Sequence, residues 1–212
     1  MTSPARRHVT VADLRARIRS LAERGDRRVI GITGAPGAGK STVAEALVES
    51  GVSILVGMDG FHLADRVLQA RSWHGRKGAP HTFDVDGFVC LLERIRDQEP
   101  NGPEVFAPYF DREIDEPIGS AVPVGSDVPV VLVEGNYLLH DADGWERVRP
   151  LLDEVWFLDP GDETRLERLI ARHERFGRDP ESARAHATGS DELNAEVVRA
   201  SCERADEVLV VD

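Results

Sequence analysis

The sequence contains little cysteine, no long apolar run and no excess of basic residues. Its two cysteines, Cys90 and Cys202, lie far apart without metal-ligand spacing, which argues against a disulfide framework or a cysteine-based metal site. The longest apolar runs, such as residues 128–133, are far too short to span a bilayer. The N-terminal stretch MTSPARRHVTVADLRARIRS lacks the apolar core of a signal peptide. We therefore expect a protein of the reducing cytoplasm with no membrane partner.

The charge balance is acidic. The chain carries 38 Asp and Glu against 26 Lys and Arg, which gives a formal net charge of −12 at pH 7. Because binding to a nucleic-acid backbone normally needs a basic face, we expect no nucleic-acid partner. With 212 residues and a hydrophobic fraction of 41%, the chain is long enough to fold as one domain with its own core. The sequence leaves open whether the chain acts alone or as a homodimer.

Short apolar runs typical of strands alternate with amphipathic segments typical of helices. A capping-box pattern from Thr10 to Asp13 precedes the first helix. Residues 99–129 contain many prolines and glycines, which indicates a short excursion of strands. The alternation predicts an α/β fold with a mainly parallel sheet. The predicted strands are residues 27–33, the run from Ser53, and residues 128–139, 152–159 and 206–212; the predicted helices are residues 11–21, 42–51, the segment after Gly60, and residues 87–98, 163–176 and 192–204.

The segment GAPGAGKST, residues 34–42, follows a predicted strand and fits the phosphate-binding pattern G-x-x-x-x-G-K-[ST]. Its glycines allow backbone N–H groups to converge on phosphate oxygens at the positive end of the next helix. Lys40 is expected to bridge the β- and γ-phosphates, and the Ser41 hydroxyl to ligate Mg²⁺. The segment therefore predicts ATP and Mg²⁺ as cofactors, the alternative being a glycine-rich turn without a ligand. The expected ATP contacts are Gly34, Ala35, Pro36, Gly37, Ala38, Gly39, Lys40, Ser41 and Thr42.

Two carboxylates follow predicted strands. Glu134 ends the run VVLVE, and Asp59 comes shortly after Ile54-Leu55-Val56. Because ligands of open α/β sheets gather at the carboxyl ends of the strands, the two acids should face one crevice. Glu134 is expected in the metal shell beside Ser41, or as a cap of the next turn. For Asp59 the alternative is likewise a helix cap.

Several motifs narrow the class of nucleotide-binding protein. A guanine-reading N-K-x-D motif is missing, which argues against a GTPase. The segments GITGAPGAGKST, MDGFH, RKGAPHTFDVDGF, PYFDREI, VEGNYLL and RLERLIARHERFGR resemble the uridine kinase, pantothenate kinase and phosphoribulokinase branch of P-loop kinases. More closely, they resemble small bacterial proteins described as nucleoside/nucleotide kinase-like. The motifs run from residue 29 to about residue 211.

The resemblance implies a P-loop NTPase three-layer fold with a mainly parallel five-stranded sheet and a small arginine-bearing lid. It implies one kinase domain over residues 1–212, with acceptor-binding loops at about 72–128 and a lid at about 162–180. It also implies ATP as donor and transfer to a hydroxyl group of a small metabolite. Asp59 matches the position at which the branch carries its general base.

The resemblance also suggests which residues bind the acceptor. Phe83 and Asp84 match a Phe-Asp pair that contacts base and ribose in uridine kinases, although Asp86 is open as an alternative to Asp84. Tyr109 and Asp111 are expected to line the acceptor pocket. His62, two residues after Gly60, is expected beside the acceptor. Uridine kinases carry a histidine after the Tyr-containing segment, and this chain does not, so nucleoside, pantothenate and sugar all stay open.

The predicted helix at residues 163–176 carries a basic stripe. Arg165, Arg168, Arg172 and Arg175 share one face, while Leu166, Leu169, Ile170 and His173 form a packing stripe. A mobile arginine lid would neutralise the transferring phosphoryl group and exclude water, so Arg168 and Arg172 are expected to contact ATP. The alternative is a solvated face paired with surface acids.

Together these features predict an ATP-dependent small-molecule kinase that transfers the γ-phosphoryl group to a hydroxyl of a nucleoside, pantothenate or sugar. The expected catalytic residues are Asp59, Lys40 and Arg172. The alternative is a P-loop nucleotide-binding regulator or assembly ATPase with no small-molecule acceptor. A regulator needs neither a base at position 59 nor an acceptor pocket formed by residues 73–112.

Overall fold

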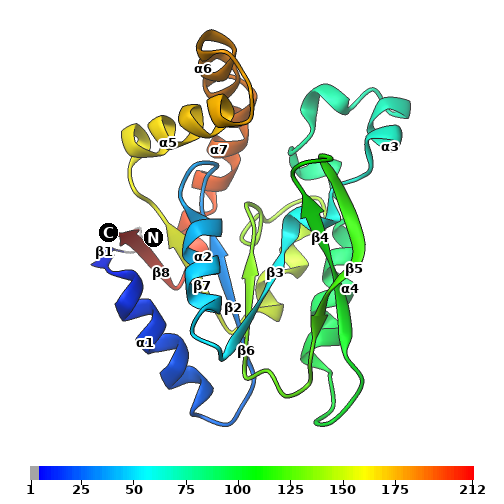
Figure 1. Cartoon of the computed structure of the whole chain (residues 1–212), viewed down its shortest axis with the longest axis vertical. Coiled ribbons are helices and arrows are strands. Elements are labelled where there is room, and N and C mark those ends of the chain that lie inside the picture. Colours follow the sequence, from blue (N-terminus) through cyan, green and yellow to red (C-terminus); the bar gives the residue numbers. More distant parts are fainter. Residues whose placement is uncertain (1–4) are drawn as a thin grey trace.

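The computed structural model describes residues 5–212, so the first four residues of the N-terminal stretch lie outside it. Its centre is a parallel six-stranded sheet with strand order β1-β8-β7-β2-β6-β3 (Figure 1). This confirms the predicted α/β fold with a mainly parallel sheet. The strands are β1 (Arg6–Val9), β2 (Arg28–Thr33), β3 (Ser53–Gly57), β6 (Val130–Glu134), β7 (Glu154–Leu158) and β8 (Glu207–Val211).

The expected count of five strands was wrong, because β1 adds a sixth at the edge. Its sequence, Arg-Arg-His-Val, has no apolar run, and three of its four residues are exposed. The strand pairs in parallel with β8, from Arg6 opposite Val208 to Val9 opposite Val211. An edge strand held by main-chain hydrogen bonds leaves little trace in a hydrophobic pattern.

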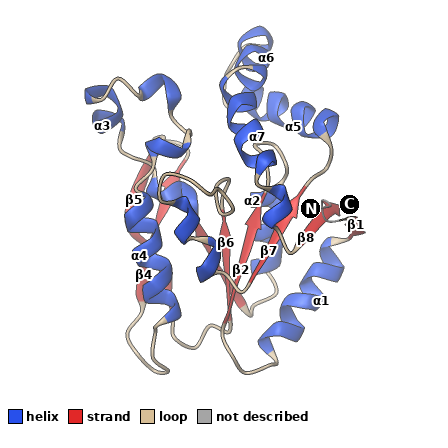
Figure 2. Ribbon diagram, turned by 180° about the vertical axis from the view of Figure 1, so that it is seen from behind, coloured by secondary structure: helices blue, strands red, loops and turns tan. Residues whose placement is uncertain are grey.

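Helices cover both faces of the sheet, which gives three layers (Figures 1 and 2). On β2, Ile30 and Ile32 lie in the core beneath α1 and α2, whereas Val29 lies in the opposite core beneath α4 and α7. This alternation is the period of two that a strand imposes. The four helices are α1 (Val11–Ala22), α2 (Lys40–Val48), α4 (Val85–Arg96) and α7 (Ser190–Ala200).

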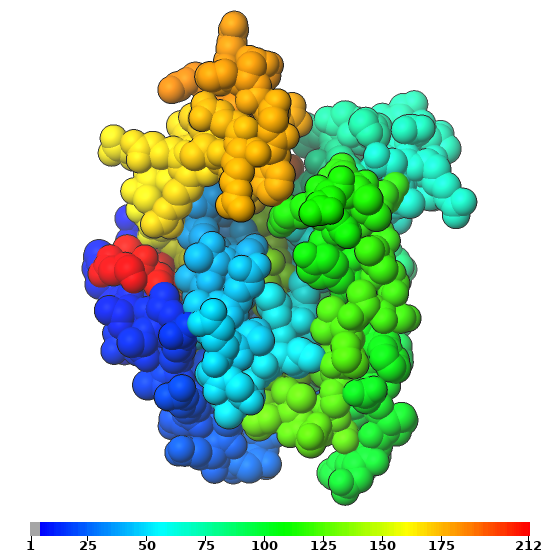
Figure 3. Space-filling view, in the orientation of Figure 1, coloured from blue at the N-terminus to red at the C-terminus, as the bar shows by residue number. Residues whose placement is uncertain are grey.

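Two further units border the carboxyl ends of the strands. One is the antiparallel hairpin of β4 (Val105–Asp111) and β5 (Glu116–Val124), which runs along the sheet beside β3 and α4 so that its turn lies at that end, near α3 (Asp65–Ala70). The other is the lid, which we define as α5 (Asp162–Arg175), α6 (Pro180–Thr188) and α7. The lid and the hairpin face each other, and the surface is hollowed between them (Figure 3). Single 3₁₀ turns occur at Met58–Phe61, His74–Arg76, Pro80–Thr82, Trp145–Arg147, Arg149–Leu151 and Cys202–Arg204.

Two helical predictions need correction. The helix expected directly after Gly60 begins only at Asp65, because the chain first makes the 3₁₀ turn Met58–Phe61. Helix α6 was not predicted, although Asp179 caps it by accepting from the Ser182 N–H at 3.0 Å. Within the described residues, no helix has both the length and the apolar character needed to cross a membrane.

Candidate active site

A cleft of about 610 Å³ opens between the lid, the hairpin and the loop that connects β2 to α2. Its lining includes Pro36 from that loop, Asp59 and His62 after β3, Arg112 from the hairpin and Arg172 from α5. Segments that are far apart in the sequence therefore meet at the carboxyl edge of the sheet, where open α/β sheets bind their ligands.

The loop before α2 has the backbone of a phosphate cradle. Gly37 has φ +86°, and a Cβ on this residue would lie 2.5 Å from the Arg165 main-chain oxygen of α5. Only glycine allows the lid helix to approach the loop so closely. The Ala38 N–H donates to the Ala35 main-chain oxygen at 3.0 Å, which tightens the turn. Helix α2 then begins at Lys40. The N–H groups of its first turn, which have no partner within the helix, therefore lie at the cradle, an arrangement that suits an anion.

Lys40 is buried beneath the cradle, at 7% exposure. Its ammonium donates to the Ala35 main-chain oxygen at 3.3 Å. Burial gives Lys40 a pKa below its ordinary value, although the charges of Glu134 and Asp59 oppose this shift. These three groups therefore lie close enough to interact, as expected for a phosphate-binding lysine between two strand-end acids. Ser41, half-buried in the first turn of α2, follows directly.

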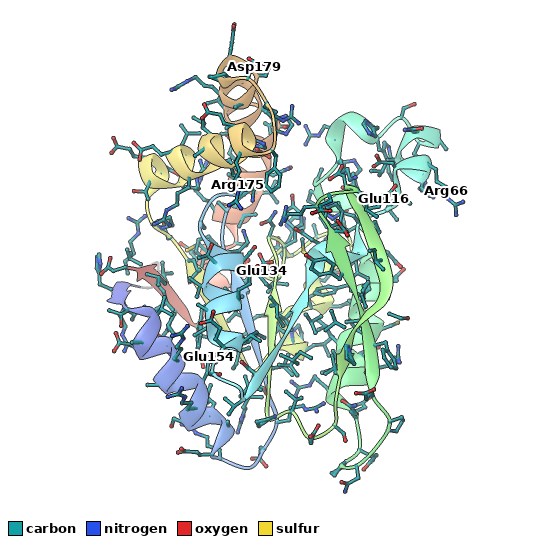
Figure 4. The ribbon with its side chains drawn as sticks, in the orientation of Figure 1. Arg66, Glu116, Glu134, Glu154, Arg175 and Asp179 are labelled. Atoms are coloured by element: carbon teal, nitrogen blue, oxygen red, sulfur yellow. The ribbon has the colours of Figure 1, made fainter. Side chains whose placement is uncertain are left out.

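Glu134 ends β6, which lies between β2 and the edge strand β3, and it pairs with Ile32 of β2 and Gly57 of β3 (Figure 4). It is 8% exposed. Burial raises the pKa of its carboxyl group to about 7, although the neighbouring Lys40 opposes the shift. A buried acid that interacts with Lys40 of the cradle, and the hydroxyl of the adjacent Ser41, offer the oxygen ligands that Mg²⁺ prefers, so these residues fit the metal.

The raised pKa of Glu134 predicts pH-dependent metal binding. Mg²⁺ must displace a proton below about pH 7, so its apparent affinity in the presence of ATP should fall by up to about tenfold per pH unit there. Glu134→Gln should weaken Mg²⁺ binding and remove this share of the pH dependence, as measured by Mg²⁺ titration of wild type and variant from pH 6 to 8. Equal metal dependence in the two proteins would exclude Glu134 from the metal shell.

The raised pKa of Glu134 also makes the stability of the folded state depend on pH. The folded-state pKa of Glu134 lies above its ordinary value of 4.5, so folding takes up a proton in the intervening pH range. The stabilising contribution of the protonated group is therefore full below about pH 4.5 and is lost as the pH rises through about 7.

Asp59 lies within the 3₁₀ turn after β3 and faces the cleft. Its carboxylate accepts from the Arg112 guanidinium at 3.3 Å. The N-cap of the 3₁₀ turn is Gly57 and that of α3 is Ala64, so neither helix is capped by Asp59. The geometry therefore removes the main alternative to a role in the cleft.

An aromatic wall, which we define as His62, Phe83 and Phe110, borders the cleft beside Asp59. The His62 ring lies 4.1 Å from the Phe83 ring and 4.8 Å from the Phe110 ring, measured between centroids. Its Nδ1 lies 2.8 Å from the Asp59 main-chain oxygen. Burial lowers the pKa of His62, although Asp59 opposes the shift. The wall is therefore a largely uncharged surface.

Three predicted acceptor residues lie outside the cleft lining. Tyr109 is 55% exposed, because a β-bulge between Ala107 and Tyr109 shifts the strand register and turns Phe110 inward instead. Asp111 accepts from the Glu113 N–H at 2.8 Å and so stabilises the hairpin turn.

The third such residue is Asp84, which is exposed and is the N-cap of α4. Its carboxylate accepts from the Gly87 N–H at 2.9 Å. The alternative residue, Asp86, pairs with Arg147 on the surface. The Phe-Asp segment therefore contributes only Phe83 to the cleft lining.

The arginine stripe of α5 is divided between two roles. Arg165 is buried and donates to the Pro36 main-chain oxygen at 3.3 Å and to Glu192, so it fixes the lid on the cradle. A guanidinium nitrogen of Arg168 would lie 3.3 Å from a Cβ on Gly39, which puts this side chain over the cradle. Arg172 lines the cleft, where desolvation and the like charge of Arg112 lower its pKa.

Arg172→Ala is expected to lower kcat by about tenfold to hundredfold and to change the KM for ATP much less, because a lid arginine acts mainly in the transition state. Steady-state kinetics with varied ATP would measure both. Arg175→Ala, an exposed position on the same helix, should behave like wild type. Equal losses in kcat and ATP affinity for Arg172→Ala would indicate ordinary ground-state binding.

The lid helices are joined by a histidine contact at the cleft margin. His173 Nε2 lies 2.6 Å from an Asp191 carboxylate oxygen, and the His186 ring packs edge-on to His173 at 4.8 Å. His173 is half-buried, as the packing stripe predicted, and in addition joins α5 to the start of α7.

The cleft residues that the sequence did not point to include Phe110, Arg112, Asn136 and Asn194. Asn136 comes two residues after Glu134, so the strand-end rule could have found it. Asn194 lies inside a regular helical pattern and gives no such signal. Phe110 was hidden by the bulge that changes which side of β4 faces inward.

Comparisons with known proteins point to one family for most of the chain. The sequence model of the Phosphoribulokinase / Uridine kinase family matches residues 29–210. A second model, that of the Methylmalonyl Co-A mutase-associated GTPase MeaB, matches only residues 3–54.

Several individual proteins are similar to the chain. A solved structure from Silicibacter sp. TM1040, described as a "putative fructose transport system kinase", has a TM-score of 0.82 and 36% identity over 94% of this chain and 98% of that one. The YggC protein of Escherichia coli (strain K12) is 31% identical and covers 81% of this chain and 73% of its own length. The ATP-dependent kinase YFH7 of Zygosaccharomyces rouxii is 28% identical over 89% of this chain, which spans 59% of that relative. The resemblance inferred from the motifs is thereby confirmed, and the chain belongs to the Phosphoribulokinase / Uridine kinase family.

Proposed function

We propose that the protein is an ATP- and Mg²⁺-dependent kinase that transfers the γ-phosphoryl group of ATP to a hydroxyl group of a small metabolite. One observation carries the proposal. Asp59 faces the cleft across from the phosphate cradle, and its charge interacts with both Lys40 and Glu134. A base and a phosphate site in one cleft are what transfer to a hydroxyl requires, and a regulator has no need for both.

In the proposed reaction the cradle and Lys40 hold the β- and γ-phosphates. Ser41 and Glu134 would hold Mg²⁺, which neutralises phosphate charge when it is bound. Asp59 orients the acceptor hydroxyl and takes its proton as the oxygen forms a bond to the γ-phosphorus. The bond between that phosphorus and the β–γ bridging oxygen breaks, and ADP leaves. Arg168 and Arg172 offset the charge that develops, while the lid limits access of water.

Nucleoside, pantothenate and sugar are all candidate acceptors in this proposal. The acidic balance of the chain supports a small-molecule partner over a nucleic acid. We further propose that the enzyme works in the cytoplasm.

A screen of ATP consumption over hydroxyl metabolites, with mass detection of products, tests the proposal. At least one compound should raise ADP formation well above the background with water alone and should gain one phosphoryl group. If a wide panel yields only the background rate, the protein is a slow ATPase of the regulator class.

A further inference from the structure

Three side chains of the types that bind metals meet in the lid, one from each of its helices. His173 lies in the last turn of α5, His186 in the last turn of α6 and Asp191 in the first turn of α7. A ring nitrogen of each histidine and a carboxylate oxygen of Asp191 all lie within 4.8 Å of one another. Helix α6 packs on both α5 and α7 (Figures 1 and 2). The cluster is therefore assembled by the packing of three helices and not by the spacing along one of them.

The distances within the cluster suit a transition-metal ion. Zn²⁺ binds imidazole nitrogen and carboxylate oxygen at about 2.0–2.2 Å, which puts neighbouring tetrahedral ligand atoms about 3.3 Å apart. His173 Nε2 lies 2.6 Å from an Asp191 oxygen, and the ring centroids of His173 and His186 are 4.8 Å apart. Binding requires the closest pair of ligand atoms to open slightly and the most distant pair to close by no more than about 1.5 Å. Small side-chain rotations can supply both changes.

His186 has a ring nitrogen free for a ligand. A metal binds only the neutral imidazole. Burial lowers the pKa of His186 and Arg178 acts in the same direction, although the charge of Asp191 opposes the shift. The Ser190 hydroxyl lies 3.4 Å from one ring nitrogen and 3.5 Å from the other, too far to hold either in a strong hydrogen bond. The His186 ring is therefore poised to bind a metal.

Two arginines near the cluster limit the affinity for a cation. Arg172 and Arg178 line the same cleft, and their charges disfavour a further positive charge at His186. Within residues 5–212, however, Asp191 is paired with His173 and with neither arginine, so its charge lies inside the cluster. An anion placed between the two rings would meet this carboxylate directly. The cluster therefore favours a cation, with an affinity that we expect to be about micromolar and weaker than that of structural zinc sites.

We propose that His173, His186 and Asp191 bind one divalent transition-metal ion of the Zn²⁺ type in the lid. Two imidazoles and a carboxylate are a ligand set that Zn²⁺ accepts, and because all three residues line the cleft, water can complete the coordination. This site is separate from the proposed Mg²⁺ site, where Ser41 and Glu134 offer oxygen ligands alone. The ion ties α5 to α6 and α7 at the margin of the cleft and so stabilises the lid.

Metal titration of the full chain tests the proposal, with the protein freed of metal and of any polyhistidine tag and with ATP left out. Calorimetry should show one Zn²⁺ per chain, and Co²⁺ should give a visible absorption band that Zn²⁺ removes by displacement. Excess Mg²⁺ should leave the band unchanged, because Mg²⁺ prefers oxygen ligands. Zn²⁺ should also raise the melting temperature, since it binds the folded lid. The proposal is overturned if neither ion binds at about millimolar concentration, or if Mg²⁺ displaces Co²⁺.

His186→Gln and Asp191→Asn each remove one ligand and keep a side chain of similar size. Each should weaken Zn²⁺ binding by at least about tenfold and reduce the rise in melting temperature. His74→Gln is the matched control, because His74 also lines the cleft beside an aspartate, Asp65 at 3.5 Å, and should bind Zn²⁺ as wild type does. If one of the two ligand variants does not fold, the other decides. Unchanged Zn²⁺ affinity in a folded ligand variant would contradict the assignment.

Discussion

Lys40→Ala is expected to lower turnover by at least about three orders of magnitude while the fold persists. Lys40 is the buried cation of the phosphate cradle, and its charge interacts with Glu134 and Asp59. Without it, the β- and γ-phosphates lose their fixed positive partner and Glu134 loses a charge that favours its ionised form. ATP turnover, ATP binding by calorimetry and the melting temperature would measure the three effects.

Lys77→Met is a matched control, because Lys77 is the only other lysine and also lines the cleft. It pairs with Asp65 and Asp115 on the acceptor side, so ATP binding should be unchanged. Wild-type turnover in a folded Lys40→Ala protein would remove the cradle as the donor site.

Asp59→Asn is expected to lower kcat by about 10² to 10⁴-fold, which corresponds to about 3–5 kcal/mol of activation barrier. Asparagine keeps the shape of the side chain but loses the charge and the proton acceptor. ATP affinity should stay near that of wild type, because Asp59 faces the acceptor. The transition state of phosphoryl transfer is loose, so part of the loss reflects orientation of the hydroxyl group.

The control for this prediction is Asp84→Asn. Asp84 caps α4 outside the cleft lining, and asparagine caps helices as well as aspartate does, so activity and stability should hardly change. Near wild-type transfer by a folded Asp59→Asn protein would show that Asp59 is not the base. The loss of its contact with Arg112 should matter little for stability, because both side chains are partly exposed.

The central sheet, the phosphate cradle and Glu134 could be predicted because their signals are local. A glycine-rich pattern between a strand and a helix constrains the backbone within nine residues, 34–42. An acid at the end of an apolar run is placed by the strand itself. Strand β1 escaped prediction because its polar residues carry no such pattern and main-chain pairing with β8 holds it at the edge.

The acceptor side was less predictable, because tertiary structure decides which side chains face inward. The bulge between Ala107 and Tyr109 shifts the strand register, so Phe110 instead of Tyr109 faces inward. Helical spacing alone puts Arg165 on the same face of α5 as Arg172. Arg165 is nevertheless buried, because α5 packs directly on Gly37 at this point. Asn194 becomes a cleft residue only because α7 folds back over the loop at Gly78.

The fate of the γ-phosphoryl group tests the proposed kinase activity most directly. ATP with oxygen-18 at the non-bridging γ-oxygens would be incubated with the enzyme, Mg²⁺ and the best acceptor, and the products analysed by mass spectrometry. A kinase yields a phosphomonoester that retains all the labelled oxygens and is bridged by an unlabelled oxygen from the acceptor, and Asp59→Asn suppresses it. If the label appears only in inorganic phosphate, at a rate independent of every acceptor, the protein is not a small-molecule kinase.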